Sequence, residues 1–388
     1  MAALAIGSFG IGTSEFSSMG LLPLFANDFS TGVADASHAI TAYATGVFVG
    51  APLVTLAAAR LNRRTLLIFL MVLFGLGNLI SGLADSLAVL TVGRFISGMP
   101  QGAYFGAGAM VASYVMGPGN GGKAFALIAF GMTVATVIGA PLGTLVGQHF
   151  GWRTTYLAVA LYAVGTLAIF WRSLPKTSAL DGASVARELA SLRNARVWAL
   201  MAISALCVSA TFAVYTFIGP IVTEVAGQSQ AVVPLALALV GLGMAVGTPI
   251  GGRMADRHEY RGMVMWFLAT LVVMALMGLF ARNIVVLMMT LFAVGVMLMA
   301  AVPTIPVRMT SMAPEAPTMM GALNMAAFNV ANALGAMAGG TTIAAGMGYV
   351  SSVWAGFAMT AAGLGFFAVL YRWLRGEVQL PASSPVGT

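Results

Sequence analysis

The chain has 388 residues, of which 60% are hydrophobic and only 7% are charged, and its formal net charge is +7. A soluble domain carries about 25% charged residues, so this composition excludes a protein whose surface faces water throughout. The single cysteine, Cys207, excludes a disulfide framework.

Apolar runs of membrane-spanning length recur along the whole chain. About 20 apolar residues cross a bilayer as a helix, and runs this long and uniform do not suit barrel strands. The sequence therefore predicts an all-α membrane protein with twelve transmembrane helices in two six-helix bundles. The predicted spans are residues 2–26, 37–59, 65–84, 89–116, 124–148, 154–172, 197–226, 231–252, 262–281, 284–311, 319–346 and 350–373.

The basic residues lie on one side of these spans. With the N-terminus inside, every Lys and Arg falls in a connector on the inner side except Arg94, Arg153 and Arg282. This positive-inside bias predicts that both termini are cytoplasmic. It also accounts for the net positive charge without nucleic acid as a partner. We expect a multi-pass protein of the bacterial cytoplasmic (inner) membrane.

The longest polar stretch lies near the middle of the chain and divides six spans from six. We expect an N-terminal bundle over residues 1–172, a cytoplasmic linker over 173–196, a C-terminal bundle over 197–376 and a cytoplasmic tail over 377–388. The halves echo each other, for example in Pro23 of the first span and Pro220 of the seventh. A duplicated unit with a site at the bilayer midplane is typical of secondary transporters.

Two ionisable side chains of opposite charge, Glu15 and Arg94, fall well inside the apolar spans. A charge at mid-span costs at least about 2.5–3.5 kcal/mol, so we expect the protein to use both. At a rise of about 1.5 Å per residue, their depths are similar enough for Arg94 to approach the carboxylate directly or through water. The residue that matches Glu15 in the second half is Phe212, which confines this chemistry to the first bundle.

Two interpretations of this pair remain open. In one, Arg94 forms a fixed ion pair with Glu15, or bonds to backbone carbonyls, and holds the first bundle together. In the other, Glu15 exchanges a proton as access alternates between the two sides of the membrane. Burial disfavours the charged carboxylate and a nearby arginine favours it. A site whose hydration and partners change with conformation therefore meets the physical requirement for proton coupling.

Neutral polar and aromatic residues complete the candidate site. We predict a substrate cavity lined by Tyr43, Gln101, Tyr104, Tyr215, Asn324 and Asn329. The alternative is that the asparagines, with Asn332, are hydrogen-bonding links between helices and that the tyrosines are packing residues.

Glycine and proline residues in the fifth span predict close packing and a hinge. Gly139 and Gly143 would let another helix approach closely, and Pro141 permits a kink. Direct contact with a ligand is the alternative interpretation for these three residues.

Short basic connectors follow the second and eighth spans. Arg60 and Arg64 lie in the first of these connectors, and Asp256 and Arg257 in the second. They either anchor the topology at anionic headgroups or form a cytoplasmic gate that ties the bundles together.

These segments resemble the major facilitator superfamily. Gly252-Arg-Met-Ala-Asp256-Arg257 and Arg60-Leu-Asn-Arg-Arg64 are similar to the two copies of its signature loop, although Ala59 replaces the acid of the first copy. Arg94-Phe-Ile-Ser-Gly98-Met-Pro-Gln-Gly102 resembles its arginine–glycine element. Gly139-Ala-Pro141-Leu-Gly143 resembles the glycine–proline element of its antiporters.

Two further segments narrow the resemblance. Gly12-Thr-Ser-Glu15-Phe16 in the first span and the run from Asn324 to Gly335 in the eleventh resemble the sugar-efflux and arabinose-efflux permease branch of the twelve-span drug:proton antiporters. Many members of that branch carry an acid and a histidine where this chain has Leu24 and Gln101, so any role of those groups is altered here. The resemblance implies export and the use of protons.

We therefore expect a proton-coupled secondary transporter that exports small polar or amphiphilic solutes, such as sugars, nucleosides or drugs, with Glu15 as the coupling carboxylate. A uniporter or importer of the same fold, with Glu15 structural, is the alternative. An intramembrane enzyme or a receptor would need paired catalytic groups or a soluble sensing domain, and the sequence shows neither. The expected partners are the solute, protons and lipid, without cofactor or metal, and the expected state is a monomer.

Overall fold

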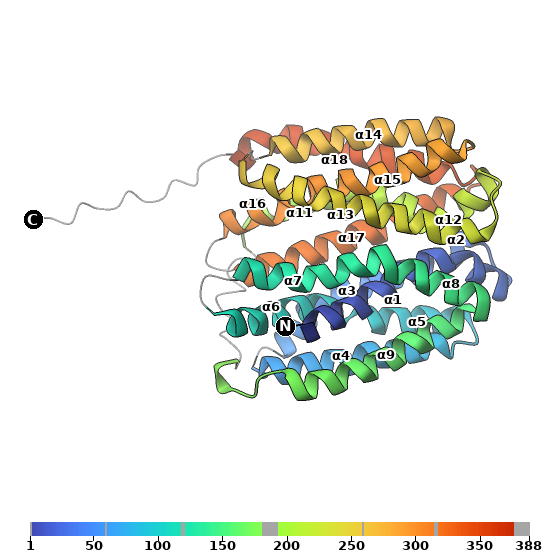
Figure 1. Cartoon of the computed structure of the whole chain (residues 1–388). Helices are drawn as coiled ribbons and strands as arrows, with labels where there is room; N and C mark the ends of the chain where they lie inside the picture. Colours follow the sequence, from blue (N-terminus) through green and yellow to red (C-terminus); the bar gives the residue numbers. More distant parts are fainter. Residues whose placement is uncertain are drawn as a thin grey trace, which may run out of the picture.

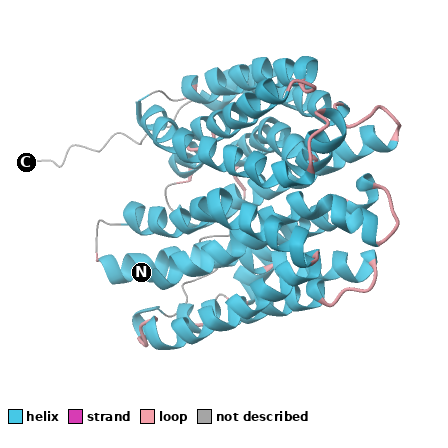
Figure 2. Ribbon diagram, turned by 45° about the vertical axis from the view of Figure 1, so that its right-hand side comes forward, coloured by secondary structure: helices cyan, strands magenta, loops and turns pink. Residues whose placement is uncertain are grey.

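The structure is a computed structural model that describes residues 2–58, 60–117, 121–180, 193–257, 260–313 and 317–375. These residues form helices and their connectors, and no strand occurs among them. The predicted all-α class is therefore confirmed. The helices run side by side as long rods, and those of the first half of the chain lie together beneath those of the second half (Figure 1; Figure 2).

The first half contains the helices of the lower group in Figure 1. They are α1 (Ala2–Asp28), α2 (Val33–Ala36), α3 (His38–Ala57), α4 (Arg63–Gly82), α5 (Leu87–Gly98), α6 (Pro100–Met116), α7 (Gly121–Val134), the π-helical η1 (Ala135–Gly139), α8 (Ala140–Phe150) and α9 (Trp152–Ser173).

The second half contains the helices of the upper group. After the 3₁₀ turn η2 (Ser178–Leu180) they are α11 (Ala195–Thr216), α12 (Ile218–Pro220), the π-helical η3 (Ile221–Val225), the 3₁₀ turn η4 (Gln230–Val232), α13 (Val233–Arg257), α14 (Arg261–Phe280), α15 (Ile284–Ala301), α16 (Thr304–Met312), α17 (Pro317–Ala344) and α18 (Ser351–Arg375).

The described helices fall within a few residues of the predicted spans. Within the described ranges, eight helical stretches are long and apolar enough to cross a membrane by length and composition. The segments α1, α3, α5–α6 and α17 lie alongside them, and α1 and α17 are the longest helices described, with 27 and 28 residues. These four segments carry the buried polar groups of the candidate site, because they supply Glu15, Tyr43, Arg94, Gln101 and Asn332.

The described ends of the chain, Ala2 and Arg375, lie at one end of the helix array, which we call the near end; the opposite end is the far end (Figure 1). At the near end, the two described parts of the linker each bond to one half of the chain. The Asn62 side chain donates to the carbonyl oxygen of Thr177 at 2.8 Å. Asn194, which caps α11, donates to the carbonyl oxygen of Met312 at 3.0 Å. Residues 181–192, the rest of the predicted linker, and the predicted tail lie outside the described residues.

Toward the far end, the two halves of the chain touch in several places. The Gln148 side chain at the end of α8 donates to the carbonyl oxygen of Gln230 at 2.9 Å. Gly219 in α12 packs against Pro23 in α1, where an added methyl group would lie only 2.9 Å from the proline ring. The helices of both halves therefore meet closely here, on the side of Glu15 away from the termini.

Glycines bring α3 and α5 into backbone contact, which fixes the positions of Tyr43 and Arg94. A Cβ atom added at Gly46 would collide with the carbonyl oxygen of Phe95, and one added at Gly98 would collide with that of Tyr43. Residues this small allow two helices to approach closely enough for backbone contact in lipid. The crossing thus positions an aromatic ring from one helix over an arginine from the other.

We expect Gly46→Ala to destabilise the protein, because the added methyl group meets backbone rather than a movable side chain. Overpacking of this kind costs about 1–3 kcal/mol, which a lower thermal unfolding midpoint in detergent would report. The matched control is Gly106→Ala in α6, since a Cβ there has nothing within 4 Å. Equal midpoints for the two variants would contradict the packing argument.

Candidate functional site

The site is centred on Glu15, halfway along α1. Its side chain is only 2% exposed, and each carboxylate oxygen accepts a hydrogen bond from a different helix. Gln101 in α6 donates through Nε2 to Oε2 at 2.9 Å, and Asn332 in α17 donates through Nδ2 to Oε1 at 3.3 Å. The carboxylate is therefore held by two neutral amides, one from each half of the chain.

The Gln101 amide is itself held in place. Its Oε1 atom accepts a hydrogen bond from the Tyr43 hydroxyl at 2.7 Å, while its Nε2 atom donates to Glu15. A continuous chain of hydrogen bonds thus runs from α3 through α6 to α1. Buried polar networks of this kind are stable only when their members are paired, because an unpaired group is costly in a low-dielectric interior.

Arg94 is fully buried beside this network but does not form an ion pair with Glu15. Its guanidinium donates to the hydroxyl of Ser14 at 2.8 Å and to the carbonyl oxygen of Ser14 at 3.1 Å. It lies 4.4 Å from the ring centroid of Tyr43 and 5.0 Å from that of Tyr156. These bonds, a longer one to the Ser97 hydroxyl at 3.5 Å and the two aromatic faces therefore hold the cation next to, rather than on, the carboxylate.

Ser14 and Asn78 link Arg94 to a third helix. The Ser14 hydroxyl donates to Oδ1 of Asn78 in α4 at 2.5 Å, and Nδ2 of Asn78 donates to the carbonyl oxygen of Phe74 at 2.8 Å. Ser18, one turn further along α1, bonds with the Tyr156 hydroxyl at 2.8 Å. Helices α1, α4, α5 and α9 are thus joined around the arginine.

Sequence reasoning missed these partners of Arg94. The available signal was the density of hydroxyl groups around Glu15, since Thr13, Ser14, Ser17 and Ser18 all fall in one apolar span. Asn332 was also absent from the predicted cavity set, although it belongs to the asparagine-rich run of the eleventh span.

The structure places some of the predicted cavity residues near Glu15 and others elsewhere. Tyr43 and Gln101 belong to the network around Glu15. Tyr215 in α11 is buried near it, with its ring 5.8 Å from that of Phe16, and its hydroxyl has no hydrogen-bond partner among the described residues. Tyr104 lies elsewhere, because its hydroxyl donates to the carbonyl oxygen of Leu4 near the start of α1 at 2.7 Å.

The two remaining asparagines of the predicted cavity lie on α17, nearer its N-terminal end than Asn332. Asn329 is buried, donates to the carbonyl oxygen of Met325 at 3.0 Å, and leaves its Oδ1 atom without a described partner. Asn324 is half-buried. Asn329 therefore has the unused acceptor expected of a residue that can bind a hydroxyl or amide group.

The glycine–proline element packs against α1. A Cβ atom at Gly139 would collide with the Thr13 hydroxyl, and one at Gly143 with the Ser17 hydroxyl. Gly139 ends the π-helical segment η1, and Pro141 lies in the first turn of the helix that follows. This geometry favours packing, and π-helical turns of this kind often occur at functional sites.

The predicted gate residues lie at the near end. Arg60 and Arg257 are exposed. Arg64 donates to the carbonyl oxygen of Trp171 at 2.7 Å and lies over its ring, which is a contact within the first half of the chain. Asp256 is in the last turn of α13, and its side chain lies outside the described residues.

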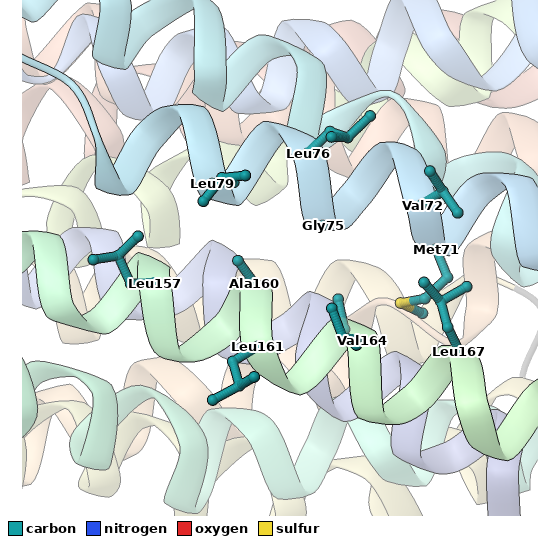
Figure 3. Close-up of a pocket in the computed structure, with 11 residues that line it drawn as sticks. Met71, Val72, Gly75, Leu76, Leu79, Leu157, Ala160, Leu161, Val164 and Leu167 are labelled. Atoms are coloured by element: carbon teal, nitrogen blue, oxygen red, sulfur yellow. The ribbon is translucent and has the colours of Figure 1, made fainter.

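An apolar groove on the outer surface separates α4 from α9 (Figure 3). It has a volume of about 380 Å³. Its lining includes Leu76 and Leu161, which are 50% and 73% exposed. The groove lacks a polar group that would orient a polar solute, so it suits lipid chains. In the described part of the chain, no group of three or more His, Cys, Asp and Glu side chains is arranged to bind a metal ion.

Long parallel helices with a buried carboxylate that is bonded from both halves of the chain are typical of a membrane transporter. The sequence profile of the Major Facilitator Superfamily matches residues 4–336 and, in an overlapping match, 201–386. The chain belongs to the major facilitator superfamily.

Several relatives match over most of their length. The chain is 38% identical to the inner membrane transport protein YdhP of Escherichia coli K12, with 89% of each chain covered. It is 32% identical to the putative transporter AraJ of the same strain, covering 99% of this chain and 97% of that protein. It is also 32% identical to a chloramphenicol resistance protein of Streptomyces lividans, with 93% of each covered.

Solved structures share the fold at low sequence identity. A bacterial homologue of the human lysosomal transporter Spinster, in an inward-facing and occupied conformation, has a TM-score of 0.73 at 14% identity, with 96% of each chain covered. A D-xylose–proton symporter has a TM-score of 0.72 at 15% identity, covering 94% of this chain and 96% of that chain. The predicted major facilitator fold is confirmed.

We expect Arg94→Ala to lower stability strongly, because it removes the hydrogen bonds from the guanidinium to Ser14 and opens a void between two tyrosine rings. Hydrogen bonds from a buried charge contribute enough that we expect a loss of roughly 2–5 kcal/mol. The unfolding midpoint in detergent measures this loss. The exposed Arg282→Ala should change it by less than about 0.5 kcal/mol, and a similarly small effect of Arg94→Ala would refute the structural role.

Proposed function

We propose that this protein is a proton-coupled exporter of small polar or amphiphilic solutes, such as sugars, nucleosides or drugs, in the bacterial inner membrane. The observation that carries the proposal is the environment of Glu15. Its carboxylate is buried between the two halves of the chain and bonded by neutral amides, while Arg94, the cation described beside it, is engaged with Ser14. A carboxyl group without a fixed salt bridge can gain and lose a proton as its hydration changes.

The position of Glu15 supports a role in alternating access. One of its hydrogen bonds comes from the first half of the chain and the other from the second. Movement of one bundle against the other would break or replace the bond to Asn332 and admit water to the carboxylate. Midplane sites at the interface of two repeats are a general feature of secondary transporters.

Export is supported by the names of relatives, among them a chloramphenicol resistance protein. The solute would bind between the bundles, where Tyr215 and Asn329 offer buried hydrogen-bonding atoms without described partners. In this proposal the first bundle occupies residues 1–172 and the second residues 197–376, and both termini are cytoplasmic. The alternative is a uniporter or importer of the same fold in which Glu15 is structural.

The proposal is tested first by counterflow in proteoliposomes over a panel of sugars, nucleosides and amphenicol-like drugs. The solute that exchanges is then used with an imposed pH gradient. We expect Glu15→Gln to lose gradient-driven accumulation down to the level of unenergised vesicles, because the amide cannot exchange a proton, yet to retain counterflow. Asp28→Asn at the far end should accumulate the solute normally.

Accumulation by Glu15→Gln at the wild-type level would show that Glu15 is structural and would refute the proposed coupling. Loss of both accumulation and counterflow in a folded Glu15→Gln protein would also contradict the proposal, because it assigns Glu15 to coupling rather than to solute binding.

A second prediction concerns the proposed gate at the near end. Neutralising Asp256 should shift the resting equilibrium toward the state that is open on that side, because a carboxylate can attract basic groups and helix N-termini of the other bundle. Cysteine accessibility at near-end positions lining the interface should rise in Asp256→Asn. The matched change Asp35→Asn at the far end should leave it unaltered. Unchanged labelling in Asp256→Asn would mean that the connector only anchors the topology.

A further inference from the structure

The two amides that hold Glu15 differ in their freedom to turn when the carboxylate gains a proton. Both polar atoms of Gln101 are engaged, one with Glu15 and one with the Tyr43 hydroxyl. Asn332 uses only Nδ2, and its buried Oδ1 atom has no hydrogen-bond partner among the described residues. The Gln101 amide can therefore turn only together with the Tyr43 hydroxyl, whereas the Asn332 amide can turn without disturbing another hydrogen bond.

This difference determines where a proton can bind. An ionised carboxylate only accepts hydrogen bonds, but a protonated carboxyl group must also donate one. A proton on Oε2 would face the N–H group of Gln101, which can turn away only if the Tyr43 hydroxyl also reverses its role and loses the amide oxygen to which it donates. A proton on Oε1 would face Asn332, whose unpaired Oδ1 atom can accept the new hydrogen bond once the amide turns.

Asn332 is also the residue through which the second half of the chain contacts the carboxylate. It lies in α17, whereas Glu15 and Gln101 lie in α1 and α6 of the first half. The hydrogen bond at 3.3 Å is longer than the 2.9 Å bond from Gln101, so it is the weaker of the two. A reversal of its direction changes a contact between the bundles without disturbing the first bundle.

We propose that protonation of Glu15 occurs on Oε1 and is transmitted to the second bundle by Asn332, whose amide turns from donor to acceptor. Asn332 is thus a positioning residue for alternating access. This inference rests on the proposed function, because it assumes that Glu15 is the group that exchanges protons.

Other titratable groups near Glu15 do not offer this link. Arg94 from α5 is bonded to Ser14, and Tyr43 from α3 is bonded to Gln101. Tyr215 from α11 is the one titratable group of the second half that interacts electrostatically with Glu15 in the described chain, but no hydrogen bond joins them. From α9, Tyr156 bonds to Ser18. The other described titratable partners of α1 lie toward its ends: Tyr104 of α6 and Tyr162 of α9 donate to the carbonyl oxygens of Leu4 and Ile6, and Arg153 of α9 pairs with Asp28. The side chains that α4, α6 and α17 bring to Ser14 and Glu15 are the neutral amides of Asn78, Gln101 and Asn332.

The experiment follows the distance between the bundles without any solute. In the full-length protein with Cys207→Ser, spin labels are placed at the exposed far-end positions Phe150 and Ser229, one in each half. Double electron–electron resonance in liposomes then gives the distance distribution over a pH series. Proton uptake by the carboxyl group is followed separately through its infrared C=O stretch.

We expect the wild-type distance distribution to change with pH and Asn332→Leu, of similar volume, to abolish that change while the carboxyl group still titrates. Gln101→Leu removes one amide from the same carboxylate and is the matched control. It should keep the pH-dependent change, with a shifted midpoint. Asn332→Gln restores an amide that can donate and accept, and it should recover part of the response.

A second variant covers failure of Asn332→Leu to fold. Asn332→Asp keeps the shape of the side chain, but its carboxylate cannot donate a hydrogen bond to an ionised Glu15. Two close carboxyl groups retain a shared proton. The distances between the spin labels in this variant should therefore stay at the wild-type low-pH values. A wild-type response in either Asn332 variant, or equal loss in Gln101→Leu, would overturn the inference. A normal pH response in Glu15→Gln would instead overturn the proposed function, so the two failures are distinguishable.

Discussion

Burial of a guanidinium away from water is the constraint on which the first bundle depends. Arg94 is fully enclosed, and the groups around it are those that a buried cation requires: a carbonyl oxygen, a hydroxyl and two aromatic faces. Each of these comes from a helix that must then lie close to α5. The backbone contact between α3 and α5 and the bonds from α1 to α4 follow from this requirement, so α1 is held in the interior and α4 and α9 face lipid.

The two buried charged side chains, Arg94 and Glu15, differ in which parts of the chain their hydrogen bonds come from. Among the described residues, Arg94 is bonded to the first half of the chain, and it bonds to a backbone carbonyl, which was one form of the structural interpretation from sequence; the ion pair, the other form, is not present. Glu15 is bonded to both halves, and neither bond is a salt bridge. Because Arg94 is fixed beside the carboxylate, its electrostatic effect on Glu15 stays constant. Changes in hydration and in the bond to Asn332 then act on Glu15 and not on Arg94.

The sequence predicted the spans well because hydrocarbon admits few alternatives to a helix of fixed length. It also predicted that Arg94 can reach the neighbourhood of Glu15, since relative depth follows from the rise per residue, and Arg94 bonds to the adjacent Ser14. It could not predict that Arg94 bonds to Ser14 rather than to Glu15, or that Tyr104 packs near Leu4. Those facts depend on the rotation of each helix about its axis and on its neighbours, which a uniformly apolar span does not reveal. Asn332 was named as a possible hydrogen-bonding link between helices, but its partner Glu15 was missed for a related reason, because Glu15 lies in the other half of the chain.

The neutrality of Gln101 has an electrical consequence. A histidine at this position would add a second group able to bind a proton beside Glu15. With glutamine there, and with Phe212 at the position that echoes Glu15, the network between the bundles contains one acid. If one proton exchanges for one neutral solute at this acid, each cycle carries one net charge across the bilayer. A membrane potential then contributes about 2.3 kcal/mol per 100 mV to export, whereas exchange for a monovalent cationic solute would be electrically silent.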